Sequence, residues 1–161
     1  MAEYIVESKP AIIEQQTRVL VRVVLVGLVL GVVAWVLTYL LQHYVLNAIF
    51  CQNNQAVCGN LAVYAGNITA VIMAIIGVVA MVRIGVYRPL LVALCVMVSL
   101  WGLAGWLGQL GVLEAVFWTA ILYAAAYSLY AWLARLRHPV VMLLVVLGVV
   151  VLTRVIPMFV K

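Results

Sequence analysis

Six polar side chains in this sequence have the chemistry for ligand binding or ion pairing, and each lies in or beside a long apolar run. Ionisable and amide groups inside a membrane are rare, and they commonly mark ligand sites or ion pathways. An arginine can pair with a glutamate, and asparagine or glutamine amides can bind a polar solute or join neighbouring helices. The candidate residues are Asn60, Tyr64, Asn67, Gln109, Glu114 and Arg154.

The spacing of these residues predicts that they meet near one surface. Asn60, Tyr64 and Asn67 follow i, i+4, i+7 spacing and so share one face of a helix. Arg154 lies about 22 Å along the last apolar run, at 1.5 Å per residue, which is the outer third of a hydrocarbon core of about 30 Å. Glu114 opens the fourth run at the same surface, so it is the expected partner of Arg154.

Two interpretations of this polar cluster are open. In the first, the cluster is a structural clamp: Arg154 extends to the lipid headgroups or pairs with Glu114, and the amides bond across helices. In the second, the same residues line an external polar vestibule that admits a ligand. We expect the clamp and keep the vestibule as the alternative.

Cys51 and Cys58 lie seven positions apart in a polar segment that is expected outside the cell. Extracytoplasmic spaces permit disulfides, so we expect a structural bridge that closes a small loop. The alternative is thiol exchange, but the spacing is not CxxC, and Cys95 is expected to be a small buried residue. Two sulfurs are too few for a structural zinc site, which takes four ligands. We therefore expect no metal and no cofactor.

The elements that position these residues follow from the composition. Of 161 residues, 70% are hydrophobic and 8% are charged, against about 45–50% and about 25% in soluble domains. The chain is therefore expected to be an all-α, polytopic integral membrane bundle in the cell membrane, because runs of about 20 apolar residues predict spanning helices. We predict a segment 1–18 at the cytoplasmic interface and a five-helix domain 19–161, with spans at about 19–45, 60–82, 89–110, 113–134 and 139–157.

The basic residues predict the orientation of these spans. Six arginines precede the first run or join the second to the third and the fourth to the fifth, whereas segments 46–59 and 111–112 contain no Lys or Arg. These arginines are Arg18, Arg22, Arg83, Arg88, Arg135 and Arg137. The positive-inside rule then places the N-terminus in the cytoplasm and the C-terminus outside. The net charge of +5 is thus a topology signal rather than a nucleic-acid surface. The segment 1–14 carries three acids and does not resemble a removable signal peptide, so we expect the first span to remain.

Glycines predict where the helices pack. Without water to expel, membrane helices associate where small residues let backbones approach. In the third run, glycines step by three and cover about half of the circumference of a helix with 3.6 residues per turn, which suits a helix with several neighbours. A pore lined by bare backbone or a hinge is the alternative. The packing candidates are Gly27 and Gly31 in the first run and Gly102, Gly105, Gly108 and Gly111 in the third.

The function classes that remain are three. No spacing resembles a nucleotide-binding loop or a hydrolase nucleophile elbow, so we expect a non-enzymatic scaffold or accessory subunit. Its expected partners are the lipid bilayer and further copies or other membrane proteins, not nucleic acid. A small-solute or ion transporter or channel is the alternative, although the middles of spans one, two and five are nearly all Val, Leu, Ile, Ala and Gly. A membrane thiol oxidoreductase is the second alternative.

Overall fold

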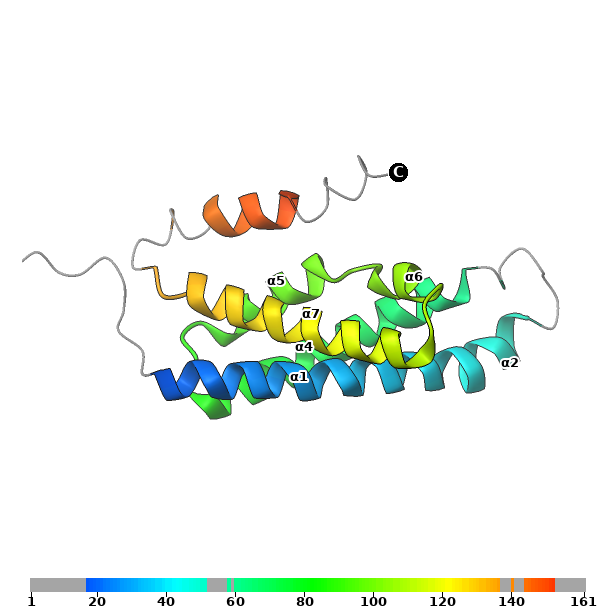
Figure 1. Ribbon diagram of the computed structural model, residues 1–161. Coiled ribbons are helices and arrows are strands. Elements are labelled where there is room, and N and C mark those ends of the chain that lie inside the picture. Colours follow the sequence, from blue (N-terminus) through cyan, green and yellow to red (C-terminus); the bar gives the residue numbers. More distant parts are fainter. Residues whose placement is uncertain (1–16, 52–57, 59, 137–139, 141–143, 153–161) are drawn as a thin grey trace, which may run out of the picture.

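The computed structural model describes residues 17–51, 58, 60–136, 140 and 144–152, and the regular structure in these ranges is helical with no strand (Figure 1). Residues 144–152 are helical as well. The remaining elements, in chain order, are α1 Thr17–Leu40, a π-helix Leu41–Leu46, α2 Asn47–Phe50, α4 Leu61–Ile84, α5 Pro89–Ser99, α6 Leu103–Leu107 and α7 Val112–Leu133.

Three helices are long and apolar enough to cross a membrane: Arg18–Phe50, Leu61–Ile84 and Val112–Leu133. They match the first, second and fourth predicted spans. In lipid no water can bond to exposed N–H and C=O groups, so an apolar run must satisfy its backbone internally as a helix. The all-helical class is therefore confirmed for the part of the chain that the structure describes, and the three long apolar helices fit a membrane protein. Segments 1–16 and 153–161, which include both termini, lie outside it.

The third run departs from the prediction, because it is not one helix. α5 ends at Ser99 after 11 residues, and the chain resumes as α6, five residues long, at Leu103. Gly102 has φ +82°, a left-handed conformation that ends a right-handed helix. The expectation of a continuous helix over 89–110 is therefore wrong, since the glycine interrupts it near the middle.

α1 and α7 make the closest helix contact, and glycine on one meets alanine on the other (Figure 1). A Cβ built on Gly27 would lie 2.7 Å from Cα of Ala124, and one on Gly31 would lie 2.6 Å from Cα of Ala120. Any side chain at these glycines would have to displace backbone. Because the paired residue numbers run in opposite directions, the two helices are antiparallel.

Buried side chains form two separate clusters along the bundle. The larger one contains Val23, Met73, Met81, Val92, Val96, Tyr127 and Tyr130. The smaller one consists of Leu46, Leu61 and Ala65, with Cys51 and Cys58 packed against it. The first cluster fills the half of the bundle that contains the start of α1 and the ends of α4 and α7, and the second lies at the opposite end.

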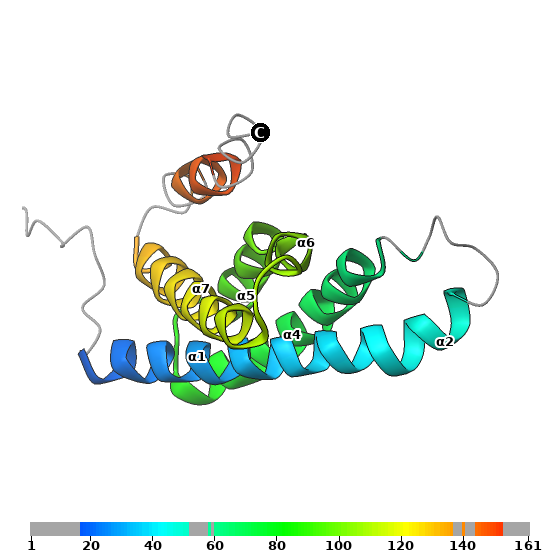
Figure 2. The same cartoon turned by 45° about the vertical axis from the view of Figure 1, so that its right-hand side comes forward.

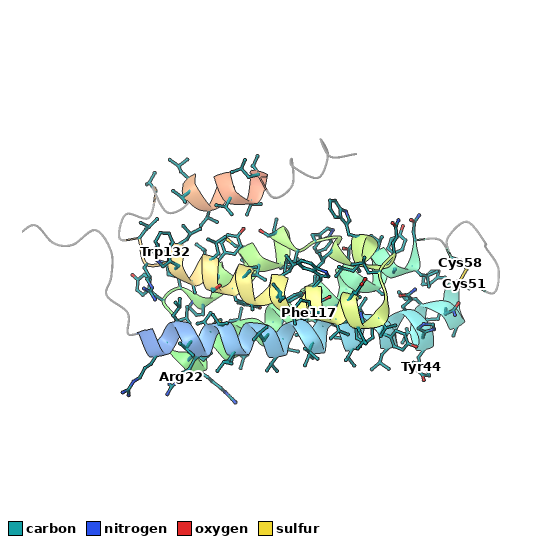
Figure 3. The ribbon with its side chains drawn as sticks, viewed as in Figure 1. Arg22, Tyr44, Cys51, Cys58, Phe117 and Trp132 are labelled. Atoms are coloured by element: carbon teal, nitrogen blue, oxygen red, sulfur yellow. A yellow bond between two sulfur atoms is a disulfide. The ribbon has the colours of Figure 1, made fainter. Side chains whose placement is uncertain are left out.

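The charged residues are also divided between the two ends of the bundle. Within the described ranges every arginine lies at the end formed by the start of α1, the end of α4, the start of α5 and the end of α7 (Figure 1). Glu114, which is the one carboxylate in those ranges, lies in the first turn of α7 at the other end. Figure 3 shows Arg22 at one end and the cysteine pair at the other. The arginines are Arg18, Arg22, Arg83, Arg88 and Arg135.

The α1–α7 contact gives a stability prediction. Gly31→Ala should lower the free energy of unfolding by about 1–3 kcal/mol, because the new methyl group meets the backbone of Ala120. Gly148→Ala is the matched control, since nothing lies within 4 Å of a Cβ at that helical glycine. Denaturant titration in detergent measures both variants. Equal stability of the two would contradict the close approach of the helices.

Candidate functional site

The interruption between α5 and α6 is held by turn-type hydrogen bonds. The amide of Leu100 donates to the carbonyl of Val96 at 2.9 Å, that of Leu103 to Leu100 at 3.1 Å, and that of Gly105 to Gly102 at 3.1 Å. Irregular backbone at membrane depth is tolerated only where it is buried in protein or lines a cavity. The interruption is therefore the first place to look for a site.

A cavity of about 100 Å³ lies against this interruption. α1 and the π-helix form one wall, α7 a second, and the start of α4 a third; the chain from Leu100 through α6 to Gly108 closes the fourth. The lining residues are Ala34, Trp35, Thr38, Tyr39, Gln42, Ala62, Gly66, Leu100, Leu103, Ala104, Leu107, Gly108, Ala115, Thr119 and Tyr123. A water molecule needs roughly 10–15 Å³ of such space, so the cavity has room for several waters or one small solute.

The polar groups of the cavity wall include both hydrogen-bond donors and acceptors, among them the indole N–H of Trp35 and the hydroxyls of Tyr39 and Tyr123. Thr38 donates its hydroxyl hydrogen to the carbonyl of Ala34 at 2.8 Å, and Thr119 donates to Ala115 at 2.6 Å. Their oxygen lone pairs remain as acceptors because each hydroxyl has two. Gln42 adds an amide with both donors and acceptors. An uncharged ligand that both donates and accepts hydrogen bonds suits this set.

Aromatic rings line the α1 side. The rings of Trp35 and Tyr39 are stacked with centroids 5.5 Å apart, and Tyr39 lies 4.5 Å from the ring of His43. His43 belongs to the π-helix, whose wider turns follow α1 directly. π-helical turns inside α-helices often occur at functional sites. Cavity, helix interruption and π-helix thus coincide in the half of the bundle away from the arginines.

The polar cluster predicted from the sequence does not line this cavity. Asn60, Gln109 and Glu114 are exposed, Tyr64 is 56% exposed, and Asn67 is half-buried. The backbone amide of Tyr64 donates to the carbonyl of Asn60 at 3.2 Å, but no hydrogen bond or ion pair joins the side chains of these five residues. Arg154, the expected partner of Glu114, lies outside the described residues.

Two buried side-chain oxygens on α4 have no hydrogen-bond partner: Oδ1 of Asn67 and Oγ1 of Thr69. Thr69 is only 1% exposed. It lies three residues after the cavity-lining Gly66, so it shares a helix face with that glycine one turn deeper. An orphaned buried hydroxyl calls for an explanation such as an ordered water. The region around the cavity therefore has hydrogen-bonding capacity that the protein itself does not use.

The sequence analysis missed the residues that form the α1 wall. Trp35, Thr38, Tyr39 and Gln42 follow i, i+3, i+4, i+7 spacing, which places them on one helix face. This spacing is a signal that could have found them. It was hidden by the apolar composition of the first span as a whole.

Between the cavity and the arginine end, packed side chains fill the bundle. Tyr127 and Met73 are buried to 1% exposure, and a side chain on Gly77 would collide with the hydroxyl of Tyr127. The hydroxyls of Ser99 and Tyr130 share a hydrogen bond that ties the end of α5 to α7. The cavity thus ends against tightly packed core and does not continue toward the arginines.

The expected disulfide is present. Cys51 and Cys58 are bonded, with Cα atoms 5.5 Å apart (Figure 3), and both pack against the smaller core cluster. Cys95 is a free, half-buried thiol that packs against the other core cluster. Among the described residues no group of His, Cys, Asp and Glu is placed to hold a metal ion.

Comparison with known proteins adds no identity, because no protein-family profile, curated protein or solved structure matches the chain. The function must therefore be inferred from the geometry described above. The two geometric facts that bear on it most are the dead-end cavity and the apolar outer faces of the helices.

The interruption of the third run is tested by Gly102→Ala. At φ +82° a Cβ costs about 1–2 kcal/mol, so the variant should be less stable than the wild type. Gly111→Ala is the control, since Gly111 has an extended backbone and open space around it. Thermal unfolding in detergent measures both. A gain of about 1 kcal/mol in Gly102→Ala would instead indicate a continuous helix, in which alanine is preferred over glycine.

Proposed function

We propose that this protein is a non-enzymatic accessory subunit or scaffold of the cell membrane, which works by packing its outer helix surface against another membrane protein. The proposal includes five spans, with the N-terminus in the cytoplasm and the C-terminus outside. The observation that carries it lies on α4, whose exposed face has the regularity of a helix-packing surface.

The exposed face of α4 carries β-branched side chains at heptad spacing. Steps of three and four residues repeat along it, and Ile75 at its centre is 65% exposed. Such spacing matches the left-handed crossing of about 20° that is common between membrane helices. β-branched side chains are stiff at χ1 and lose little freedom when packed. Lipid requires only apolar character, so the regular spacing favours a helical partner. The α4 stripe is Ile68, Val71, Ile75, Val79 and Val82, all of which are exposed.

The charge distribution supports the orientation. Every described arginine lies at one end of the bundle and the described carboxylate at the other. Cytoplasmic ends of membrane helices carry an excess of Arg and Lys, so the arginine end is assigned to the cytoplasm. The disulfide at the opposite end then lies on the oxidising side, as disulfides require.

A small-solute transporter or channel is the second candidate, and the cavity beside the interrupted helix favours it. Discontinuous membrane helices commonly form substrate sites in transporters. The closed core around Tyr127 and Met73 argues for a binding pocket rather than a passage. The oxidoreductase alternative has less support, because the disulfide and Cys95 pack against different core clusters and form no relay.

The topology is tested by labelling single cysteines in a Cys95→Ala background. Tyr87→Cys should react with membrane-impermeant maleimide only from the cytoplasmic side, and Val112→Cys only from outside; both positions are exposed. An epitope tag after Lys161 should be accessible from outside, which distinguishes five spans from an even number. Outside labelling of position 87 would reverse the assigned orientation.

The partner surface is tested with a photo-reactive benzophenone amino acid in native membranes. At Ile75 it should give one protein adduct of defined mass, because the α4 stripe packs against another helix. At Phe117 on α7, which is also exposed, it should give lipid adducts alone. Lipid adducts at both positions would overturn the accessory-subunit proposal. Protein-dependent solute flux into proteoliposomes would favour the second candidate.

A further inference from the structure

The cavity beside the interruption of the third run has an uncharged wall. Its volume is about 100 Å³, and none of the described residues that line it is Asp, Glu, Lys, Arg or His. Figures 1 and 2 both show α6, which forms part of one wall, across the bundle from α1, which forms another. An unpaired ion costs far more to bury than a neutral polar group. A ligand that fits this wall is therefore neutral.

Two threonine hydroxyls in the wall can accept hydrogen bonds but have no hydrogen left to donate. Thr38 on α1 and Thr119 on α7 each donate to a carbonyl of their own helix, and each oxygen keeps acceptor capacity. Because Gly31 meets Ala120 and the helices are antiparallel, Thr38 lies about six residues, or roughly 9 Å, further along the bundle than Thr119. One hydroxyl with hydrogen bonds of about 2.8 Å cannot reach both oxygens. A ligand that satisfies both needs hydroxyl groups on separate carbon atoms.

The aromatic part of the wall favours a ligand with a carbon skeleton over water alone. Trp35 and Tyr39 stack with ring centroids 5.5 Å apart, and Tyr123, which is 6% exposed, adds a third ring from α7. Aromatic side chains combine an apolar ring with an N–H or O–H group that bonds to a partner. Water would satisfy the hydroxyls but would not cover the ring faces. A polyol does both, because its C–H groups contact the rings while its oxygens accept from the indole and phenol donors.

The depth of the cavity places it near the outer surface of the membrane. Along α1, Ala34 lies roughly 18 Å and Gln42 roughly 30 Å from Arg22, at 1.5 Å per residue. The hydrocarbon core is about 30 Å thick, so the cavity extends from the outer half of the core to the interface opposite the arginines. Packed side chains around Tyr127 and Met73 separate it from the arginine end. A ligand therefore reaches it from the outer side.

We propose that this cavity binds one small neutral polyol, whose hydroxyls donate to Thr38 and Thr119 and whose carbon skeleton lies against Trp35 and Tyr39. Such a ligand contacts α1, α7 and the interrupted segment together. The same chemistry occurs in a free polyol and in the glycerol group of a lipid, and the experiment separates these two sources. The inference goes beyond the accessory-subunit proposal and does not rest on it.

The test is saturation-transfer NMR of the full chain in deuterated phosphocholine detergent, with free glycerol as the first probe. The wild type should transfer saturation to the glycerol protons. Thr119→Val keeps the shape of the side chain but removes the acceptor, so it should lower the transfer about five-fold. Ser128→Ala is the matched control on α7, since Ser128 also donates to its own helix, at the carbonyl of Ala124, but does not line the cavity. It should leave the transfer unchanged.

Filling the cavity gives an independent variant that keeps both threonines. Ala62→Leu, on the α4 wall, should lower the transfer at least five-fold. Ala80→Leu adds the same bulk at another half-buried alanine of α4, outside the cavity, and should not.

Monoolein, which carries glycerol on an acyl chain, is the second probe. Transfer to free glycerol supports the site with a soluble polyol, and transfer to the glycerol protons of monoolein alone supports it with a lipid headgroup. No transfer to either probe, or equal transfer in the wild type, Thr119→Val and Ala62→Leu, would rule out the polyol site. These outcomes do not involve the α4 stripe, so they separate the polyol site from the accessory-subunit proposal.

Discussion

The close approach of α1 and α7 is the constraint on which the rest of the bundle depends. Lipid tails are as apolar as leucine, so burial gives membrane helices little reason to associate, and contact has to come from packing. Gly27 and Gly31 let the backbone of α1 meet that of α7 directly. The same logic repeats at Gly77, where the missing side chain leaves room for Tyr127. The larger core cluster is built around these contacts.

The cavity follows from where α6 is fixed. Gly66 of α4 meets Ala104, and Gly105 meets Val63, so the short helix is held against α4. It is not held equally against α1 and α7, and the cavity lies on that side. The hydroxyls of Thr38 and Thr119, which bond within their own helices, then face space rather than another backbone. The interruption at Gly102 therefore lies beside a cavity whose wall includes these hydroxyl groups.

The sequence could predict how far along a helix a residue lies, but not which way the helix turns that residue about its axis. The length of the apolar runs predicted the helical class and three of the spans, and the expected position of Cys51 and Cys58 in an external segment predicted the bond between them. Asn60, Gln109 and Glu114 were placed near one surface by depth, but each has its side chain exposed rather than turned inward. The interruption of the third run at Gly102 could not be predicted, because hydropathy carries no information about the sign of the backbone angle φ.

The two ends of the bundle are stabilised in different ways. At the arginine end the core is filled by the larger cluster, and an apolar groove lies between α5 and residues 144–152. Toward the other end a disulfide joins Cys51 to Cys58 beside the smaller cluster, and the cavity wall, which includes Ala34 and Tyr123 of the larger cluster, carries hydroxyl and amide groups. A chain with covalent restraint at one end needs less core there. That allows polar side chains to line a cavity without loss of the fold, while the end without a covalent link depends on packing alone.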